Sequence, residues 1–280
     1  MTHDRAESHP TLDQRIAEFR RLHGAGCFVM PNPWDPGSAR ALVQLGFPAV
    51  ATTSSGFAWS RGRPDNHVSL DDALAHLRDM AAAVPVPVNA DFEGGFATSP
   101  ADVERNVMAA AVTGVAGLSI EDSTGDAASP LYDFDLSVAR IRAARSAIDR
   151  AQPGVVLTGR SEGFIAGRPD LAETIRRLTA YAQAGADCVY APGIRGRDQV
   201  EAVVRAVRPV PVNVLVSGDW ATVAELAALG VRRISVGGAL ARVAWTAFLA
   251  AAGEIAQGGT FGGMRGVVPG DEMNRRFGAE

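Results

Sequence analysis

Acidic side chains follow several apolar runs of the sequence, in positions where they could act together. Asp91 and Glu93 end the run VPVNADFE, Glu121 lies in GLSIED, and Asp65 lies in the loop after an earlier run. Carboxylates gathered at one place repel one another unless a cation neutralises them, and hard oxygen ligands without His or Cys suit Mg²⁺ or Mn²⁺. The pattern therefore predicts a divalent metal site built from these four residues.

The same acidic residues have a simpler interpretation. Asp and Glu after a strand often cap the next helix, which for any single residue is about as common as a ligand role. The coincidence of acidic residues after two separate runs favours the metal site. Asp122 and Glu162 are the weakest candidates, because each adjoins a loop and is expected to face solvent.

One arginine, Arg160, lies near the end of the otherwise apolar run VVLTGRSE. Its guanidinium could bind a carboxylate or phosphonate through two hydrogen bonds, and it could also pair with Glu121 to balance charge. Ser54 and Ser55 precede Gly56, where backbone N–H groups could approach an anionic substrate, although a Ser/Thr run can equally serve packing. Further polar residues near the ends of runs are assigned to substrate binding: Trp34, Asn89 and Asn213.

These residues need a scaffold that brings the ends of many strands together, and the order of the elements supplies one. Eight short apolar runs alternate with helical segments, after a first amphipathic helix expected at 11–23. Several of the intervening helices begin with a Ser or Asp suited to an N-cap. The expected strands are 27–32, 49–56, 86–93, 117–122, 155–162, 188–193, 210–217 and 233–238.

A strand followed by a helix, repeated eight times, predicts an α/β fold, a single (β/α)₈ TIM barrel over residues 1–280 with its core at about 25–258. In such barrels the active site lies at the carboxyl ends of the strands. A doubly wound open sheet is the alternative, but it would normally carry a Gly-rich turn after its first strand, where this sequence has NPWDPGS. Residues 240–257 are expected to form a C-terminal helical extension, followed by a Gly-rich loop, arm or packing appendage.

Composition excludes several classes of protein. All 27 basic residues are arginine, so enzymes that need a lysine amine, such as Schiff-base aldolases, pyridoxal-phosphate enzymes and P-loop proteins, are excluded. A net charge of −4 without a basic stripe argues against nucleic acid as a partner. Cys27 and Cys188 suggest neither a disulfide framework nor a zinc motif. We expect no apolar run of the roughly 18 residues that cross a bilayer and no signal peptide at 1–10, hence a cytoplasmic protein without a membrane partner.

Seven motifs, in this order, carry a family resemblance: NPWDPGSARAL, TTSSG, RGRPD, VPVNADFEGGF, GLSIEDS, LTGRSEGF and PVNVLVSG. The sequence resembles the isocitrate lyase/phosphoenolpyruvate mutase superfamily from about residue 11 to residue 240. The resemblance implies an Mg²⁺-dependent barrel that makes or breaks C–C or P–C bonds next to a 2-oxo acid through an enolate. It also implies a homo-oligomer, a dimer or tetramer that exchanges its final helix between neighbours.

The resemblance also implies roles for individual residues. Ser55 and Gly56 are similar to the backbone cradle for the substrate carboxylate, and Asp65 to the acidic residue of the following loop. Glu121 is similar to the family's glutamate and Arg160 to its substrate-binding arginine. Arg160, Glu121 and Asp65 are accordingly the expected catalytic residues.

Two departures from the family pattern narrow the chemistry. Asp91 resembles the second aspartate of the family's Asp-x-Asp motif and Asn89 replaces the first, so direct metal ligation would fall to Asp91, helped by Glu93, with weaker affinity. The gating loop at 123–129 reads STGDAAS and has no Cys, Lys or His, which makes isocitrate cleavage improbable. These features favour decarboxylation or hydrolytic C–C cleavage of a small 2-oxo acid resembling oxaloacetate.

Three alternatives stay open from the sequence. The first is P–C chemistry of the phosphonopyruvate or phosphoenolpyruvate mutase type. The second is a sugar-phosphate isomerase or lyase that binds phosphate at Gly237 and Gly238, against which the missing lysine and the many carboxylates count. The third is a non-catalytic barrel that binds a 2-oxo acid, suggested by Asn89 and the bare gating loop.

Overall fold

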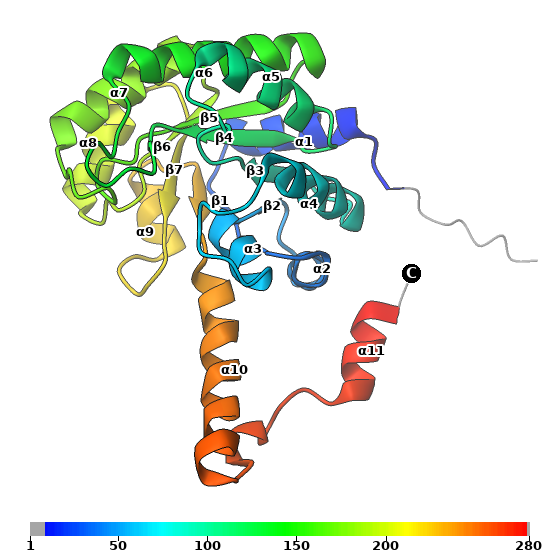
Figure 1. The fold of residues 1–280 in the computed structure, drawn as a ribbon. Coiled ribbons are helices and arrows are strands. Elements are labelled where there is room, and N and C mark those ends of the chain that lie inside the picture. The colour runs from blue at the N-terminus through cyan, green and yellow to red at the C-terminus, as the bar shows by residue number, and fades with distance from the viewer. Residues whose placement is uncertain (1–8, 279–280) are drawn as a thin grey trace, which may run out of the picture.

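The computed structural model describes residues 9–278, which form a barrel of eight parallel strands surrounded by helices (Figure 1). Neighbouring strands are paired in the order β1-β8-β7-β6-β5-β4-β3-β2, and a hydrogen bond from the Ala51 N–H to the Pro31 carbonyl (3.0 Å) links the two ends of the sheet. The predicted TIM barrel is confirmed. The strands are β1 (Phe28–Met30), β2 (Val50–Ala51), β3 (Val88–Asp91), β4 (Gly117–Glu121), β5 (Val156–Arg160), β6 (Cys188–Tyr190), β7 (Val212–Leu215) and β8 (Arg233–Ser235).

The helices alternate with the strands as the apolar pattern predicts, and their N-caps follow the expected chemistry. Ser69, Ser99 and Asp170 each accept a hydrogen bond from a backbone N–H three residues later. The helices are α1 (Leu12–Gly24), α2 (Pro36–Gln44), α3 (Ser54–Ser60), α4 (Leu70–Ala83), α5 (Pro100–Ala111), α6 (Phe134–Ala151), α7 (Leu171–Gln183), α8 (Arg197–Val207), α9 (Val223–Ala228), α10 (Ala239–Gly258) and α11 (Gly270–Gly278), with a 3₁₀ turn η1 (Gly262–Met264).

Helix α1 packs against the amino-terminal end of the barrel. Phe19 is fully buried there, and a Cβ on Gly117 of β4 would lie 2.6 Å from its ring and 2.8 Å from Oδ1 of Asn89. Only glycine leaves room for this contact. The first helix is therefore packed into the same core as the strands.

All eight predicted strands extend beyond the observed strands at their carboxyl ends, by one to five residues. Two of these differences matter for the site. Residues 54–56 belong to α3, because Thr53 caps that helix by accepting from the Gly56 N–H, so β2 is only two residues long. Residues 191–193 lie beyond β6, which ends at Tyr190. The Gly-rich tail, predicted as a loop, arm or packing appendage, contains α11, whose Arg276 carbonyl accepts a hydrogen bond of 2.6 Å from Gln44 of α2.

Helix α10 extends away from the barrel (Figure 1), and Ala241 is the buried residue along its length. It has 20 residues and a mean hydropathy of 1.3, so by length and composition alone it could cross a membrane. The expectation that no apolar run is long enough to span a bilayer is therefore wrong for this helix. Its apolar residues are exposed rather than packed against the barrel.

Candidate active site

A cavity of about 160 Å³ lies at the carboxyl ends of the strands, where the sequence predicts the site. Seven of the predicted site residues line it: Ser54, Ser55, Asp65, Asn89, Asp91, Arg160 and Asn213. Four others are not in its lining. Glu93 lines a smaller neighbouring cavity that it shares with Asp91, while Trp34, Gly56 and Glu121 line neither cavity.

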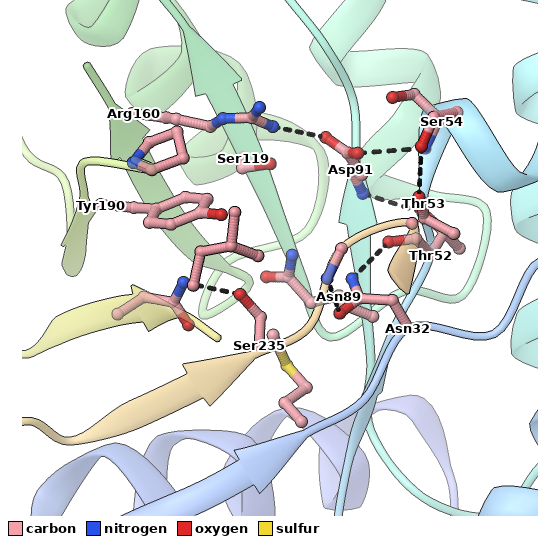
Figure 2. A pocket seen from close by; sticks show the side chains of 18 of the residues that line it. Asn32, Thr52, Thr53, Ser54, Asn89, Asp91, Ser119, Arg160, Tyr190 and Ser235 are labelled. Atoms are coloured by element: carbon pink, nitrogen blue, oxygen red, sulfur yellow. Dashed lines mark hydrogen bonds and ion pairs between the residues drawn. The ribbon is translucent and has the colours of Figure 1, made fainter. Parts of the chain in front are cut away.

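Asp91 lies at the end of β3 and joins three elements (Figure 2). Its Oδ1 accepts from Nη1 of Arg160 (3.0 Å), and its Oδ2 accepts from the backbone N–H of Ser54 (3.0 Å). Its own backbone N–H donates to Oγ1 of Thr52 (2.8 Å). The carboxylate is therefore held in one orientation between β5 and the start of α3.

Arg160 contacts more carboxylates than one positive charge can neutralise. Nη1 bonds Asp91 and also lies 3.1 Å from Oε2 of Glu121, while Nε donates to Glu162. Burial disfavours the charge, but the carboxylates of Glu162, Glu121 and Asp91 together raise the pKa of Arg160 well above its usual value. Its guanidinium carbon lies 5.3 Å from the centre of the Tyr190 ring, a cation–π contact.

The remaining acidic residues share this excess of negative charge. Burial, followed by the charges of Asp91 and Asp65, raises the pKa of Glu93 to about 8. Burial and then Asp91 raise the pKa of Asp65. Burial also raises the pKa of Glu121 well above its usual range, and Glu162, Asp91 and Glu93 add to the effect. An added cation would relieve this repulsion.

The donor set fits a cation held largely through water. Within residues 9–278, no three His, Cys, Asp or Glu side chains lie close enough together to form a ready-made metal cluster. Mg²⁺, however, usually keeps several water ligands and takes only one or two carboxylates from the protein. Asp91 as a direct ligand, with Asp65, Glu93 and Glu121 around it, matches that requirement.

Asp122 and Glu162 are buried, contrary to the expectation that they face solvent. They are 2% and 3% exposed. Asp122 accepts from the Glu162 N–H (2.8 Å), from Arg177 (2.9 Å) and from the Tyr181 hydroxyl (2.6 Å). Through these bonds Asp122 fixes the chain that follows β5, and Glu162 in turn holds Arg160.

The backbone cradle predicted at residues 54–56 is mostly occupied by the protein itself. The N–H of Ser54 binds Asp91, and that of Gly56 binds Thr53. A Cβ on Gly56 would lie 2.7 Å from Thr53 and 3.0 Å from Cβ of Trp34, so this glycine allows α3 to approach the Trp34 segment.

Asn89 lies two residues before Asp91 on β3, so its side chain points to the same side of the strand, inside the barrel. It is 3% exposed, and its Oδ1 has no hydrogen-bond partner among the described residues. A buried acceptor without a partner lowers the stability of the folded chain. A hydrogen bond to Oδ1 from a ligand or water in the cavity would remove that cost.

Sequence analysis missed several residues that line the cavity, among them Tyr190, Arg233 and Ser235. Tyr190 ends β6 and lines the cavity. Side chains alternate along a strand, so Tyr190 lies on the same side as Cys188 two residues earlier. The signal was missed because the predicted strand was extended to residue 193. Arg233 and Ser235 stand in the same alternation on β8. Arg233 is 2% exposed and forms no ion pair with a described carboxylate; it donates to Asn213 (2.9 Å) and Thr158 (3.0 Å) instead.

The predicted gating loop folds on itself beyond β4. Ser123 and Leu131 form an antiparallel bridge, and Oγ1 of Thr124 donates to the Ser129 carbonyl (2.5 Å). No residue from 123 to 131 lines the cavity.

Comparisons with known proteins agree with the fold. The family model of phosphoenolpyruvate phosphomutase matches residues 19–256. A curated relative, the oxaloacetate decarboxylase of Bradyrhizobium diazoefficiens, is 32% identical over 192 residues, which cover 66% of this chain and 65% of the relative.

Solved structures extend the comparison over nearly the whole chain. A protein of Burkholderia cenocepacia J2315 provisionally called a lyase/mutase is 49% identical, with a TM-score of 0.93 over 96% of this chain and 98% of that one. Oxaloacetate acetylhydrolase in complex with oxalate is 28% identical, with a TM-score of 0.83 over 93% of each chain. 2,3-Dimethylmalate lyase, a member of the PEP mutase/isocitrate lyase superfamily, is 28% identical, with a TM-score of 0.83 over 94% of each chain. The chain therefore belongs to the phosphoenolpyruvate mutase/isocitrate lyase superfamily, as a carbon–carbon lyase.

Proposed function

We propose that this protein is an Mg²⁺-dependent lyase that cleaves a C–C bond of a small 2-oxo acid resembling oxaloacetate, with decarboxylation as the reaction. The observation that carries the proposal is the contact between Asp91 and Arg160 at a cavity of about 160 Å³, with Asp65, Glu93 and Glu121 nearby. A cavity of this size suits a small molecule rather than a large one.

Asp91 is the residue assigned to hold Mg²⁺ directly, with Asp65, Glu93 and Glu121 binding its water ligands. Mn²⁺ has the same ligand preference and could replace it. When bound, the ion supplies Lewis-acid stabilisation of the charge that develops on the keto oxygen of the substrate.

Arg160 binds and orients the anionic substrate. Its Nε and Nη1 are engaged by carboxylates, whereas Nη2 makes no hydrogen bond with any residue from 9 to 278. This leaves one edge of a permanently charged guanidinium for a substrate carboxylate. Loss of CO₂ needs no general base, which suits a site whose gating loop offers none.

The names of the relatives support this choice of substrate class. Oxaloacetate decarboxylase and oxaloacetate acetylhydrolase both act on a four-carbon 2-oxo acid, and the first is 32% identical to this chain. Hydrolytic cleavage to oxalate and acetate is the nearest competing reaction. Phosphonate chemistry, suggested by the name of the matching family model, is the next alternative.

The sugar-phosphate alternative is disfavoured by the strand β8 loop. The backbone N–H groups of Val236 and Gly237 both donate to Oδ1 of Asn32 (2.9 Å each) and are not available to a phosphate. The non-catalytic alternative has no such geometric objection, so an assay must decide it.

The test is turnover of oxaloacetate by the purified chain with and without Mg²⁺, with products resolved by NMR. Pyruvate and CO₂, formed only with the metal, support decarboxylation. Oxalate with acetate would replace it by hydrolysis, and interconversion of phosphonopyruvate and phosphoenolpyruvate would replace it by mutase chemistry. Metal-dependent binding of oxaloacetate without any product would refute a catalytic role.

We further propose that the chain forms a dimer or tetramer in the cytoplasm, with α10 exchanged between copies. Leu240, Val243, Trp245, Phe248 and Leu249 on this helix are between 36% and 67% exposed. Exposed apolar side chains in this number mark an interaction surface. A cavity lined by Trp59, Arg63, Arg242 and Trp245 lies between this helix and the end of α3.

A further inference from the structure

Tyr190 occupies a central position in the cavity that the proposed mechanism has not used. It ends β6, is 8% exposed, and its carbonyl accepts a hydrogen bond of 2.8 Å from the Ser161 N–H. Figure 2 shows its ring reaching from the strand beside Arg160, with the hydroxyl group directed into the cavity. The tyrosine is therefore held through its backbone and through the face of its ring, while its hydroxyl group makes no contact that fixes it.

A chain of hydrogen bonds leads from a buried arginine to Ser235, which lines the same cavity as Tyr190. Nε of Arg233 donates to Oδ1 of Asn213 (2.9 Å), and Nδ2 of Asn213 donates to Oγ of Ser235 (2.9 Å). Because Oγ of Ser235 already accepts from Asn213, its own hydrogen points away from that bond. The nearby Ser235 hydroxyl favours the phenolate form of Tyr190 and so lowers its pKa, against the larger effect of burial.

The Tyr190 hydroxyl is free to act on a molecule in the cavity. It makes no hydrogen bond with any residue from 9 to 278, so its hydrogen is left for a group in the cavity. The nearby Ser235 hydroxyl favours negative charge on the oxygen once that hydrogen has been given up. Arg233 supplies positive charge at the far end of the chain, and it forms no ion pair with any described carboxylate that would cancel it.

Other proton donors around the cavity are less suitable. Oγ of Ser119 donates to the Ala90 carbonyl, and Oγ1 of Thr52 accepts from the Asp91 N–H. Asp65 lies near Asp91, on the side assigned to the metal. Burial raises the pKa of Tyr190 to about 12, so its proton is present at neutral pH.

We propose that Tyr190 is the catalytic acid that delivers a proton to the substrate carbon after C–C cleavage, and that Ser235, Asn213 and Arg233 position it. This inference rests on the proposed 2-oxo acid lyase activity. It assigns a donor to a step for which the gating loop offers none.

The step balances without any further reactant. The C–C bond to the departing CO₂ breaks, and its electron pair forms the enolate of the remaining 2-oxo acid. The O–H bond of Tyr190 then breaks, its proton forms the new C–H bond at C3, and the keto group is restored. The phenolate left on Tyr190 takes a proton from solvent water, and nothing is oxidised or reduced.

The test compares the wild-type chain with Tyr190→Phe, which removes only the hydroxyl group. A 3-methyl-substituted oxaloacetate is supplied with Mg²⁺ in D₂O, and the configuration at the deuterated C3 of the 2-oxobutanoate product is measured by NMR after immediate trapping. The wild-type chain is expected to deuterate one face. Tyr190→Phe is expected to give racemic product, because the released enol is protonated by water, and to lose about 10²- to 10⁴-fold in ketonised product formed on the enzyme.

A matched control keeps the result specific. Tyr132→Phe removes the hydroxyl of a tyrosine outside the cavity, which lies 3.3 Å from the Thr98 hydroxyl, and it is expected to behave as wild type. Ser235→Ala tests the positioning chain: the product should stay stereospecific while turnover falls. Wild-type stereochemistry and turnover in Tyr190→Phe would overturn the inference, and so would racemic product from the wild-type chain, although in both cases the lyase activity would stand.

A second experiment tests Tyr190 even if the proposed lyase activity is absent. If the wild-type chain does not consume oxaloacetate, exchange of the methyl hydrogens of pyruvate in D₂O with Mg²⁺ reports the proton transfer alone. Exchange that Tyr190→Phe abolishes supports the inference without the lyase activity. Exchange that the variant leaves unchanged, or no exchange in the wild-type chain, refutes it.

Discussion

Nε2 of His23 lies 3.2 Å from Nη1 of Arg233, at the amino-terminal end of the barrel. Nδ1 of the same imidazole lies 2.7 Å from the Phe19 carbonyl, an acceptor, so Nδ1 carries the hydrogen. Nε2 is then a lone-pair acceptor for the arginine, and His23 is neutral in the folded chain. Burial, with the charge of Arg233 adding to it, lowers the pKa of His23 to about 3.

This pair predicts that acid destabilises the protein from a mild pH onward. The ordinary histidine pKa is 6.5, so below pH 6.5 the unfolded chain binds a proton at His23 that the folded chain does not bind. The free energy of unfolding should therefore fall as the pH drops from 6.5 towards 3, by about 1.4 kcal/mol per pH unit for this group. His76, whose pKa burial lowers to about 4, adds a second contribution.

Urea denaturation between pH 7 and about pH 4 checks this prediction. His23→Gln keeps an acceptor for Arg233 but does not titrate, so it should flatten the pH dependence while leaving the part due to His76. His9→Gln, at an exposed histidine, should not change the slope. A wild-type slope in His23→Gln would contradict the assignment.

Asp91→Asn should abolish the response of the protein to metal. The substitution removes the charge that we assign to direct ligation while keeping the shape of the side chain. In the wild-type chain, oxalate should raise the melting temperature only when Mg²⁺ is present, because it resembles the enolate and binds the folded state alone. The variant should show no metal-dependent shift.

Asp102→Asn is the control for that substitution, since Asp102 lies in the first turn of α5, outside the cavity lining, and pairs with Arg105 on the surface. It should keep the shift due to Mg²⁺ and oxalate. Retention of the shift in Asp91→Asn would remove Asp91 from the metal site.

Gly117→Ala should destabilise the barrel through its contact with α1. The added Cβ would lie 2.6 Å from the Phe19 ring and 3.0 Å from the Val156 carbonyl, and neither can move freely inside the core. Overpacking of this kind costs about 1–3 kcal/mol of unfolding free energy. Gly24→Ala, at a position with no atom within 4 Å of the new Cβ, should be neutral or slightly stabilising in the same denaturation experiment.

Phe248→Asp should shift the oligomeric state towards the monomer. Phe248 is 60% exposed on α10, so a charge there costs the folded monomer little but would be buried in an exchanged-helix assembly. Light scattering after size exclusion measures the mass. Leu45→Asp, at a residue that is 69% exposed outside α10, should leave the mass unchanged.

The architecture could be predicted from the sequence because a local pattern of residues identifies most of the strands and helices. Apolar runs, caps and turns recur eight times, and this repetition admits few folds. Thr53 shows the limit of such patterns: TTSSG reads as a continuation of β2, yet the Thr53 side chain caps a helix at the next residue. The competition between strand and cap is decided by the packing of α3 against the Trp34 segment.

The residues at the cavity could be predicted in part, and their mutual contacts could not. Alternation along β3 and β5 is enough to direct Asp91 and Arg160 to one end of the barrel. That Arg160 is shared by three carboxylates depends on where Asp122 fixes the chain after β5, through partners 55 and 59 residues further along the sequence. Such distant constraints leave no local pattern.

The packing of Phe19 and His23 into the barrel has a practical consequence for where the molecule can be shortened. An expression fragment that starts at residue 25 would keep every strand but expose Gly117 and deprive Arg233 of one of its three hydrogen-bonding partners. Such a truncation would open the amino-terminal end of the barrel to solvent and loosen Arg233 beneath the proposed proton donor, although it deletes no residue that lines the cavity.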